Sequence, residues 1–551
     1  MKTIKFYIIA FLLLLKFTNG ISQVLTPKWE SCFGGTEWDE ATGIILVDST
    51  YFVVAQTKSN DGDISYNHGT YDIWFLNVDA NGNLISEKTF GGSYADALFI
   101  DIKAKNDSVF YIAAWSQSED GDISNNPWPN ASGNLWVLQV NKQGDILWET
   151  MAGGSKEDEL RDMKVTNDGG ILLLAFTDSY DGDVTGYHGG YDLWLIKIDS
   201  TGQKQWNKCF GGNGLEDGGS VIQTSDGGYM IIGDTDGRGG GNYDTTCNFH
   251  NPGSFYSDTW IVKLDSDGNI EWQQCYGGSY HDYANNAIEL SDGYIILAGT
   301  MSNDGDVSGY HGIPGPGDNG DDIWVFKIDK SGNLLWQKCL GGTYIEWARN
   351  IFPTSDGGFM IVGSTDSNDG DVVGFHGEIP GFSLNDIWFT KIDSIGNLIW
   401  QYCYGGDLDE MIYRGVWQKS DWDYVLSIAT STVDWKCYPS YPPSGGYNLY
   451  DIRISELYDS TMVNIISTES ENNNIYIYPN PATNYLNIDF SAILLKNNIT
   501  VEIIDLNGQI LYTKKSSSQN LKIDMSNFKK GLYLIRVHMK EKILTKKIII
   551  L

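Results

Sequence analysis

The sequence predicts an all-β chain, a seven-bladed β-propeller followed by a small β-sandwich. Three observations support this prediction. A Gly-Gly pair recurs at spacings of 57 to 66 residues, each unit between pairs holds four strand signals, and the two ends of the repeat carry complementary pieces of one unit. The pairs begin at Gly34, Gly91, Gly153, Gly211, Gly277, Gly341 and Gly405.

Each unit reads as two hairpins. After the Gly-Gly pair, an apolar run ends in a turn such as residues 224–228, where Asp-Gly between apolar runs is a hairpin signal. The second hairpin is clearest in residues 321–342, which turn at Gly332-Asn333 and then carry Trp336. Four antiparallel strands in each of seven units are typical of a propeller.

The two ends of the repeat predict how the ring closes. Residues 27–33 read as a lone fourth strand, and residues 450–454 read as a third strand with no fourth strand after it. If the first strand completes the last blade, the ring closes and two exposed sheet edges disappear. We therefore place the propeller at residues 23–457.

Tryptophan occupies two fixed positions in the second hairpin, where large aromatic rings are expected to pack blade against blade. The third-strand set is Trp74, Trp136, Trp194, Trp260, Trp324 and Trp388, and the fourth-strand set is Trp29, Trp148, Trp206, Trp272, Trp336 and Trp400. Aromatic residues in loops are better suited to stack on a sugar, namely Trp38, Trp128, Trp347 and Trp435.

The formal net charge is −34, and the acidic excess lies between residues 23 and 474 because both ends are net basic. Such a body repels nucleic acid and anionic lipid, so we expect neither as a partner. It favours cations, neutral sugars or basic proteins, although solubility alone also accounts for the charge.

Residues 1–22 read as a signal peptide. Lys2 and Lys5 precede an apolar run over residues 6–15, and Gly20-Ile21-Ser22 offers small residues for cleavage before Gln23. The run is short for a membrane span, and we expect no transmembrane segment elsewhere.

Five of the seven cysteines hold one repeat position: Cys32, Cys209, Cys275, Cys339 and Cys403. Equivalent positions in different blades lie too far apart to bridge, so we expect five buried, unbridged side chains. Cys247 and Cys437 lie in irregular loops, and a bridge between these two is one option.

Beyond a polar linker at residues 458–474, residues 475–551 are net basic and alternate apolar with polar residues, which predicts a β-sandwich. This segment contains residues 478–481 (YPNP), 503–509 (IIDLNGQ), 530–536 (KGLYLIR) and 546–550 (KKIII). It resembles the type A C-terminal sorting domain of the type IX secretion system of Bacteroidota. The matching motif residues are Pro479, Asn480, Pro481, Asp505, Gly508, Gly531 and Tyr533.

The resemblance implies that the type IX machinery is a partner. It also implies export across the outer membrane, removal of this domain, and either surface anchoring or release. The alternative is an ordinary β-sandwich binding module.

An acidic residue follows each second glycine by four positions: Asp39, Asp96, Asp158, Glu216, Asp282, Glu346 and Glu410. Because this loop leads into the innermost strand, the seven carboxylates are expected to form a ring at one mouth of the channel. Crowded like charges raise one another's pKa unless a cation or backbone N–H groups compensate them. The alternative is that each carboxylate ties down its own loop.

The loop between the second and third strands repeats Asp-Gly-Asp, and closely spaced Asp around Gly can gather oxygen ligands for Ca²⁺. The candidate calcium ligands are Asp61, Asp63, Asp181, Asp183, Asp304, Asp306, Asp369 and Asp371. The alternative is a turn in which Asp accepts backbone N–H groups. In four blades a His follows, which we expect to pack the loop: His68, His188, His311 and His376.

The sequence favours a secreted or surface-anchored binding or adhesion protein with a glycan or protein ligand, and calcium is the one cofactor that it suggests. The alternative is an extracellular polysaccharide-degrading enzyme, a glycosidase or lyase that uses carboxylates on the loop face. An enzyme should break the repeat, most visibly in the divergent loops at residues 238–257 and 433–447. No nucleophile elbow, P-loop or zinc signature stands where a fold would use it, so no catalytic residue is assigned.

Overall fold

A computed structural model of the chain contains two compact units, one of them spanning Leu25–Tyr458 and the other containing Asp459–Leu551. The structure describes residues 25–129, 131–237, 256–313, 320–377, 384–406, 409–431 and 451–459 of the propeller region. In the C-terminal unit it describes residues 476–478, 485–489, 499–504, 510–516, 520–525, 528–529, 531–538 and 543–550. The predicted signal peptide, most of the linker and most of both divergent loops lie outside these residues.

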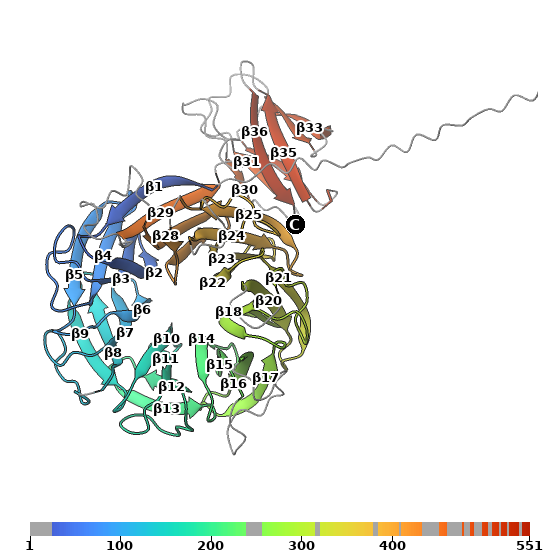
Figure 1. The fold of residues 1–551 in the computed structure, drawn as a ribbon. Coiled ribbons are helices and arrows are strands. Elements are labelled where there is room, and N and C mark those ends of the chain that lie inside the picture. Colours follow the sequence, from blue (N-terminus) through green and yellow to red (C-terminus); the bar gives the residue numbers. More distant parts are fainter. Residues whose placement is uncertain are drawn as a thin grey trace, which may run out of the picture. The chain divides into compact units, whose positions relative to one another are not determined.

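Seven antiparallel sheets are arranged around a central axis, which confirms the predicted propeller (Figure 1). Six blades have four consecutive strands each. Each blade is given from its innermost strand outward. Blade one has β2 (Asp39–Val47), β3 (Thr50–Thr57), β4 (Asp72–Asp79) and β5 (Leu84–Phe90); blade two has β6 (Leu98–Asn106), β7 (Val109–Ser116), β8 (Asn134–Asn141) and β9 (Ile146–Ala152); and blade three has β10 (Asp158–Val165), β11 (Ile171–Thr177), β12 (Asp192–Ile198) and β13 (Lys204–Phe210). Blade four has β14 (Glu216–Gln223), β15 (Tyr229–Thr235), β16 (Asp258–Leu264) and β17 (Ile270–Tyr276); blade five has β18 (Asp282–Leu290), β19 (Gly293–Thr300), β20 (Asp322–Ile328) and β21 (Leu334–Leu340); and blade six has β22 (Glu346–Pro353), β23 (Phe359–Thr365), β24 (Asp386–Ile392) and β25 (Leu398–Tyr404).

The seventh blade closes the ring with the first strand of the chain, as predicted. Its sheet order is β1 (Leu25–Phe33), β29 (Asp451–Asp459), β28 (Asp423–Thr430) and β26 (Glu410–Met411), with β27 (Val416–Ser420) also paired to β28. The buried carboxylate of Glu456 on β29 accepts hydrogen bonds from Trp29 Nε1 at 2.9 Å and Lys28 Nζ at 2.7 Å, both on β1. The two ends of the repeat are thereby held together.

The third-strand tryptophans form the core between blades, as expected. All six, from Trp74 to Trp388, are 0% exposed. Each indole N–H donates to a polar side chain on the fourth strand of its own blade, as Trp324 does to Gln337 Oε1 at 3.1 Å. A buried indole N–H needs a hydrogen-bond acceptor, which explains why a polar residue recurs thirteen positions after each of these tryptophans.

The innermost strand of each complete blade carries a β-bulge in the same place. The register shifts between Ala41 and Gly43, Leu98 and Asp101, Leu160 and Asp162, Gly218 and Ser220, Ala284 and Asn286, and Ala348 and Asn350. In the seventh blade the inner strand is instead divided into β26 and β27. A bulge leaves a residue out of the ladder and redirects its side chain.

The cysteine prediction is wrong for two residues. Cys209, Cys339 and Cys403 are free and buried, as expected, but Cys32 and Cys275 are disulfide-bonded. Their strands, β1 and β17, lie on opposite sides of the ring in Figure 1, so they do not bridge each other. Cys247 and Cys437, the other two cysteines of the chain, lie outside the described residues.

The C-terminal unit is the predicted β-sandwich. One sheet has the order β30 (Tyr476–Tyr478), β31 (Tyr485–Asp489), β34 (Asn520–Asp524), and the other has the order β33 (Ile510–Ser516), β32 (Ile499–Ile504), β35 (Gly531–His538), β36 (Ile543–Ile550). Both sheets contribute to one apolar core that includes Leu486, Ile523 and Ile535. Of the motif residues, Gly531 begins β35 and Tyr533 is buried, while Pro479, Asn480, Pro481, Asp505 and Gly508 lie outside the described residues.

Candidate functional site

The seven acidic residues of the predicted ring are all buried, with at most 2% of any of them exposed. Asp39 shows the pattern. Its carboxylate accepts a hydrogen bond from the backbone N–H of Gly35 at 2.7 Å, from Ser59 Oγ at 2.8 Å, and from the hydroxyl of Thr57. The backbone bond from the second glycine recurs in every blade. Each carboxylate therefore fixes its own loop, and a joint role as a ring at the channel mouth stays a prediction.

A second carboxylate stands beside most of these acids. The Cβ atom of an alanine at Gly34 would lie 2.7 Å from Asp451 Oδ1 and 3.1 Å from Asp39 Oδ2, so both groups face one glycine. Corresponding pairs join Asp72 with Asp96, Asp192 with Glu216, Asp258 with Asp282, Asp322 with Glu346, and Asp386 with Glu410. At the seventh junction an amide replaces one carboxylate, and Asn134 stands beside Asp158.

Burial is the main cause of the pKa shifts in these groups. It raises the pKa of Asp39 to about 6 and that of Glu346 to about 8. The pKa of Asp451 rises to about 7, first through burial and then through the neighbouring Asp39. A carboxylate loses hydration when it is buried, so its protonated form becomes more favourable.

The candidate calcium ligands in the Asp-Gly-Asp loops bind the backbone of the Gly-Gly loop. Asp304 accepts from the N–H of Ser279 at 2.7 Å and from its hydroxyl at 2.6 Å, and Asp306 accepts from the N–H of Gly277 at 3.3 Å. Asp61 and Asp63, Asp181 and Asp183, and Asp369 and Asp371 make the corresponding backbone contacts. Within the described part of the chain there is no group of three or more His, Cys, Asp or Glu that could hold a metal ion. Calcium binding stays a prediction.

Gly121, the central glycine of one such loop, tests how tightly the two loops pack. It has φ of +72°, and a Cβ there would lie 2.2 Å from the backbone oxygen of Gly91. We expect Gly121→Ala to lower the free energy of unfolding by on the order of 3 kcal/mol in urea titrations. Gly169→Ala is the matched control, because Gly169 has φ of +78° but nothing within 4 Å of its Cβ. Equal losses for both variants would contradict the packing argument.

The four histidines after these loops contact the third-strand aspartates. Nδ1 of His68 lies 2.7 Å from Asp72 Oδ2, and the same pairing in the other blades measures 2.8, 2.7 and 2.8 Å. In each case the histidine backbone N–H also donates to that carboxylate. The histidines thus pack their own loops.

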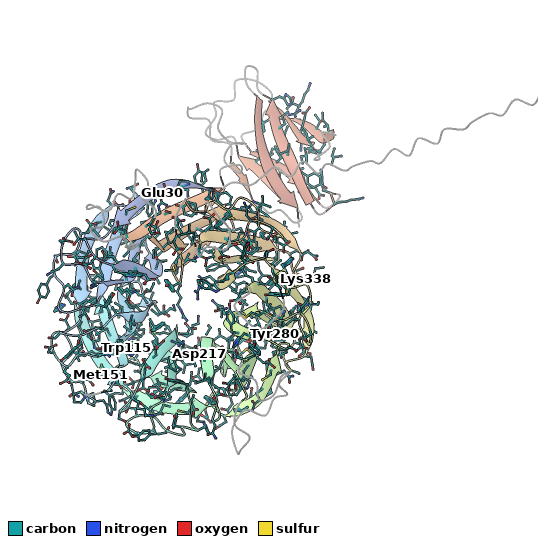
Figure 2. The ribbon with its side chains drawn as sticks, viewed as in Figure 1. Glu30, Trp115, Met151, Asp217, Tyr280 and Lys338 are labelled. Carbon is teal, nitrogen blue, oxygen red and sulfur yellow. The ribbon has the colours of Figure 1, made fainter. Side chains whose placement is uncertain are left out.

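The inner strands enclose a cavity of about 1190 Å³ at the centre of the ring. Figure 2 shows Asp217, one of its lining residues, toward the centre, whereas Glu30 and Lys338 lie toward the rim. The residues that the bulges leave out of the strand ladders all line this cavity: Thr42, Phe99, Ile100, Arg161, Gly219, Asn285 and Arg349. Tyr413 and Arg414, from the break between β26 and β27, also line it. The bulges therefore supply the cavity wall.

Two cavity arginines are held by carboxylates. Arg161 Nε donates to Asp217 Oδ1 at 2.5 Å, and its guanidinium lies 4.3 Å from the ring centre of Phe176. Arg414 donates to Asp162 and to the carbonyl of Gly219, the latter at 3.0 Å. Arg414 belongs to the seventh blade, whereas Asp162 and Gly219 belong to the third and fourth. It therefore ties distant blades together across the cavity.

Sequence reasoning missed this cavity, although a signal was present. The position three residues after each repeated acid reads Thr42, Phe99, Arg161, Gly219, Asn285, Arg349 and Tyr413. The acid is constant in charge while this position contains six residue types among seven blades. A position that differs from blade to blade, next to a residue that does not, is expected to serve a function of the whole ring and not of a single blade.

Residues 476–551 match the family described as the secretion system C-terminal sorting domain, which confirms the predicted sorting domain. The molecule is thus a β-propeller with a type IX secretion tail, and it is exported to the cell surface or released. Among the described residues, no helix has the length and apolar character needed to cross a membrane.

Solved structures with similar folds include the Pan2 WD40 domain of Neurospora crassa, at 10% identity over 80% of this chain and 96% of that chain, with a TM-score of 0.37. A DUF4221 protein of Bacteroides vulgatus is 10% identical over 79% and 98% of the two chains (TM-score 0.34), and a puromycin hydrolase is 10% identical over 83% and 62% (TM-score 0.40). These scores carry no argument about function. No curated protein matches the chain.

Proposed function

We propose that this exported propeller is a binding protein that receives part of a glycan or protein in its central cavity. The observation that supports the proposal is the location of the blade-to-blade variation. Bulged residues at equivalent positions line one cavity of about 1190 Å³ and differ in charge and size. A cavity of this size can enclose a ligand of several sugar rings or side chains.

The repeated polar residues support binding over catalysis. The acids that follow the Gly-Gly pairs accept hydrogen bonds within their own blades, and the Asp-Gly-Asp carboxylates accept backbone N–H groups. Groups used in this way stabilise loops in each blade alike. A polysaccharide-degrading enzyme, the alternative from the sequence, needs a carboxylate pair that is free to reach substrate.

The test is a binding screen of the full-length exported chain on glycan and peptide arrays. We expect reproducible binding to one class of ligand, and chromatography should show that this ligand is recovered uncleaved after incubation with the protein. Cleavage products would replace the binding proposal with the enzyme. No binding on either array would overturn it.

A further inference from the structure

Arg349 is the cavity arginine without a counter-ion. It is the bulged residue of β22 and lines the cavity. Among the residues that the structure describes, none forms a hydrogen bond or ion pair with its guanidinium, and its Nε is buried without an acceptor. Its neighbours are aromatic: the guanidinium carbon lies 5.5 Å from the ring centres of Trp347 and Tyr413.

The surroundings of Arg349 differ from those of the other cavity arginines. Burial lowers the pKa of Arg349, Tyr283 and Tyr413 oppose this shift, and the neighbouring Arg414 adds to it. The chain has six arginines (Arg161, Arg238, Arg349, Arg414, Arg453 and Arg536), and three of them line this cavity. Two of those three already have carboxylate partners. Arg349 is half-buried, and its buried Nε has no acceptor among the described residues, which is costly, so a structural role does not explain Arg349.

The chemistry of the site selects the group that Arg349 would take. A guanidinium presents a planar fork of donors that matches a carboxylate with two parallel hydrogen bonds. Seven acidic residues line the cavity, and three of them are Glu40, Asp101 and Asp217. These acids disfavour a doubly charged phosphate monoester. Among singly charged groups, the planar carboxylate matches the fork of donors better than a tetrahedral sulfate ester does.

The rest of the wall matches a sugar. The side chains of Asn285 and Asn350 and the three carboxylates can hydrogen-bond to hydroxyl groups, and Tyr283 and Tyr413 add aromatic surface. The amide nitrogen of Asn285 is buried and has no acceptor among the described residues. An acidic sugar offers both the carboxylate and the hydroxyl groups that this wall can bind.

We propose that Arg349 binds the carboxylate of a uronate sugar in the central cavity. This inference rests on the proposed binding function and specifies its ligand class. The ring centres of Trp347 and Tyr413 each lie 5.5 Å from the guanidinium carbon. The bond would be a charge-assisted pair, which is stronger than a hydrogen bond between neutral groups.

The experiment compares trisaccharides of galacturonate, glucuronate and mannuronate with their methyl esters, which add one methyl group at each carboxyl and have no charge. Titration calorimetry is run on the full-length chain and on its Arg349→Gln, Arg349→Lys and Lys338→Gln variants. Lys338 on β21 also loses one positive charge but lies away from the cavity (Figure 2). We expect one acid to bind at least tenfold more tightly than its ester. Arg349→Gln should remove this preference, Arg349→Lys should retain part of it, and Lys338→Gln should keep all of it.

Several results would overturn the inference. Equal binding of acid and ester, or a preference that persists in Arg349→Gln, would exclude the carboxylate contact while leaving a binding cavity in place. A peptide whose binding needs both its free carboxylate and Arg349 would replace the sugar. If no uronate binds, the uronate assignment fails, and the array screen shows separately whether the binding function survives.

Discussion

Replacing Arg414 with glutamine is expected to lower the free energy of unfolding by about 3 kcal/mol, because the change leaves the buried carboxylate of Asp162 without its closest cation. The side chain of Asp162 is only 2% exposed, and Arg414 is its closest ion-pair partner. The same arginine also donates to the carbonyls of Arg161 and Gly219. Urea titration followed by tryptophan fluorescence measures the change.

Arg349→Gln is the matched comparison for this prediction, since it makes the same substitution in the same cavity. Arg349 has no ion-pair partner among the described residues, so the exchange should leave the unfolding free energy unchanged or higher. If Arg414→Gln proves as harmless as Arg349→Gln, the seventh blade does not depend on the contact across the cavity.

Raising the pH from about 5 to about 8.5 is expected to lower the stability of the propeller by on the order of several kcal/mol. The pKa values of Asp39, Asp158, Asp282 and Glu346 rise to about 6, 7, 7 and 8, mainly through burial. A raised folded-state pKa means that the folded chain holds protons which the unfolded chain has lost. This contribution is therefore complete below about pH 4 and disappears as the pH passes through 6 to 8.

Carboxylates with lowered pKa values determine how the stability of the propeller falls at low pH. Lys28 and Lys419 contact Glu456, and its pKa falls to about 2 despite the opposing effect of burial. A lowered pKa gives stability that is lost only in strong acid. We therefore expect maximum stability near pH 4 and a steady fall from there to about pH 8, measured as melting temperature across a buffer series. A melting temperature that rises steadily from pH 5 to 8.5 would contradict the assignment of raised pKa values.

The chain contains its own control for the paired carboxylates. Asn134 occupies the position that Asp451 has at another junction, and Asn134 Oδ1 accepts from the N–H of Gly154 at 3.0 Å. Asp451→Asn should copy that arrangement, raise stability at pH 8 by on the order of 1–2 kcal/mol and flatten the pH profile. The reverse change, Asn134→Asp, should steepen the profile. If neither variant alters the slope, charge crowding at the blade junctions is not its cause.

The fold was largely predictable because each blade repeats the same local solution. The Gly-Gly pair, the Asp-Gly turn and Trp324 with its equivalents are needed for backbone geometry and core packing in every blade, so they recur at a readable period. Ring closure was also predictable, because the single strand at residues 27–33 has one matching gap in the repeat. The sorting domain has a sequence motif that it shares with other exported chains, and the family match confirms it.

The central cavity was not predicted, because its residues are not repeated. Arg349 and Asn285 reach the axis through bulges, and a bulge depends on the pairing of two strands rather than on a local residue pattern. The strictly repeated acids do not mark the cavity, because a residue that recurs in every blade has the same role in each blade. The disulfides of Cys32 and Cys275 were missed for the opposite reason. Their repeat position suggested five equivalent cysteines, but two of them are bonded.

The central claim is that the cavity at the axis binds the ligand, and a cavity-filling pair tests it most directly. Thr42→Trp with Asn285→Trp places two large rings on the cavity wall from two different blades. Leu335→Trp with Ile399→Trp is the matched control on outer strands, where those side chains are 52% and 62% exposed. Affinity for the array-selected ligand is measured on both full-length variants. We predict at least a tenfold loss for the cavity pair and none for the outer pair, whereas unchanged affinity in a folded cavity pair would contradict the account.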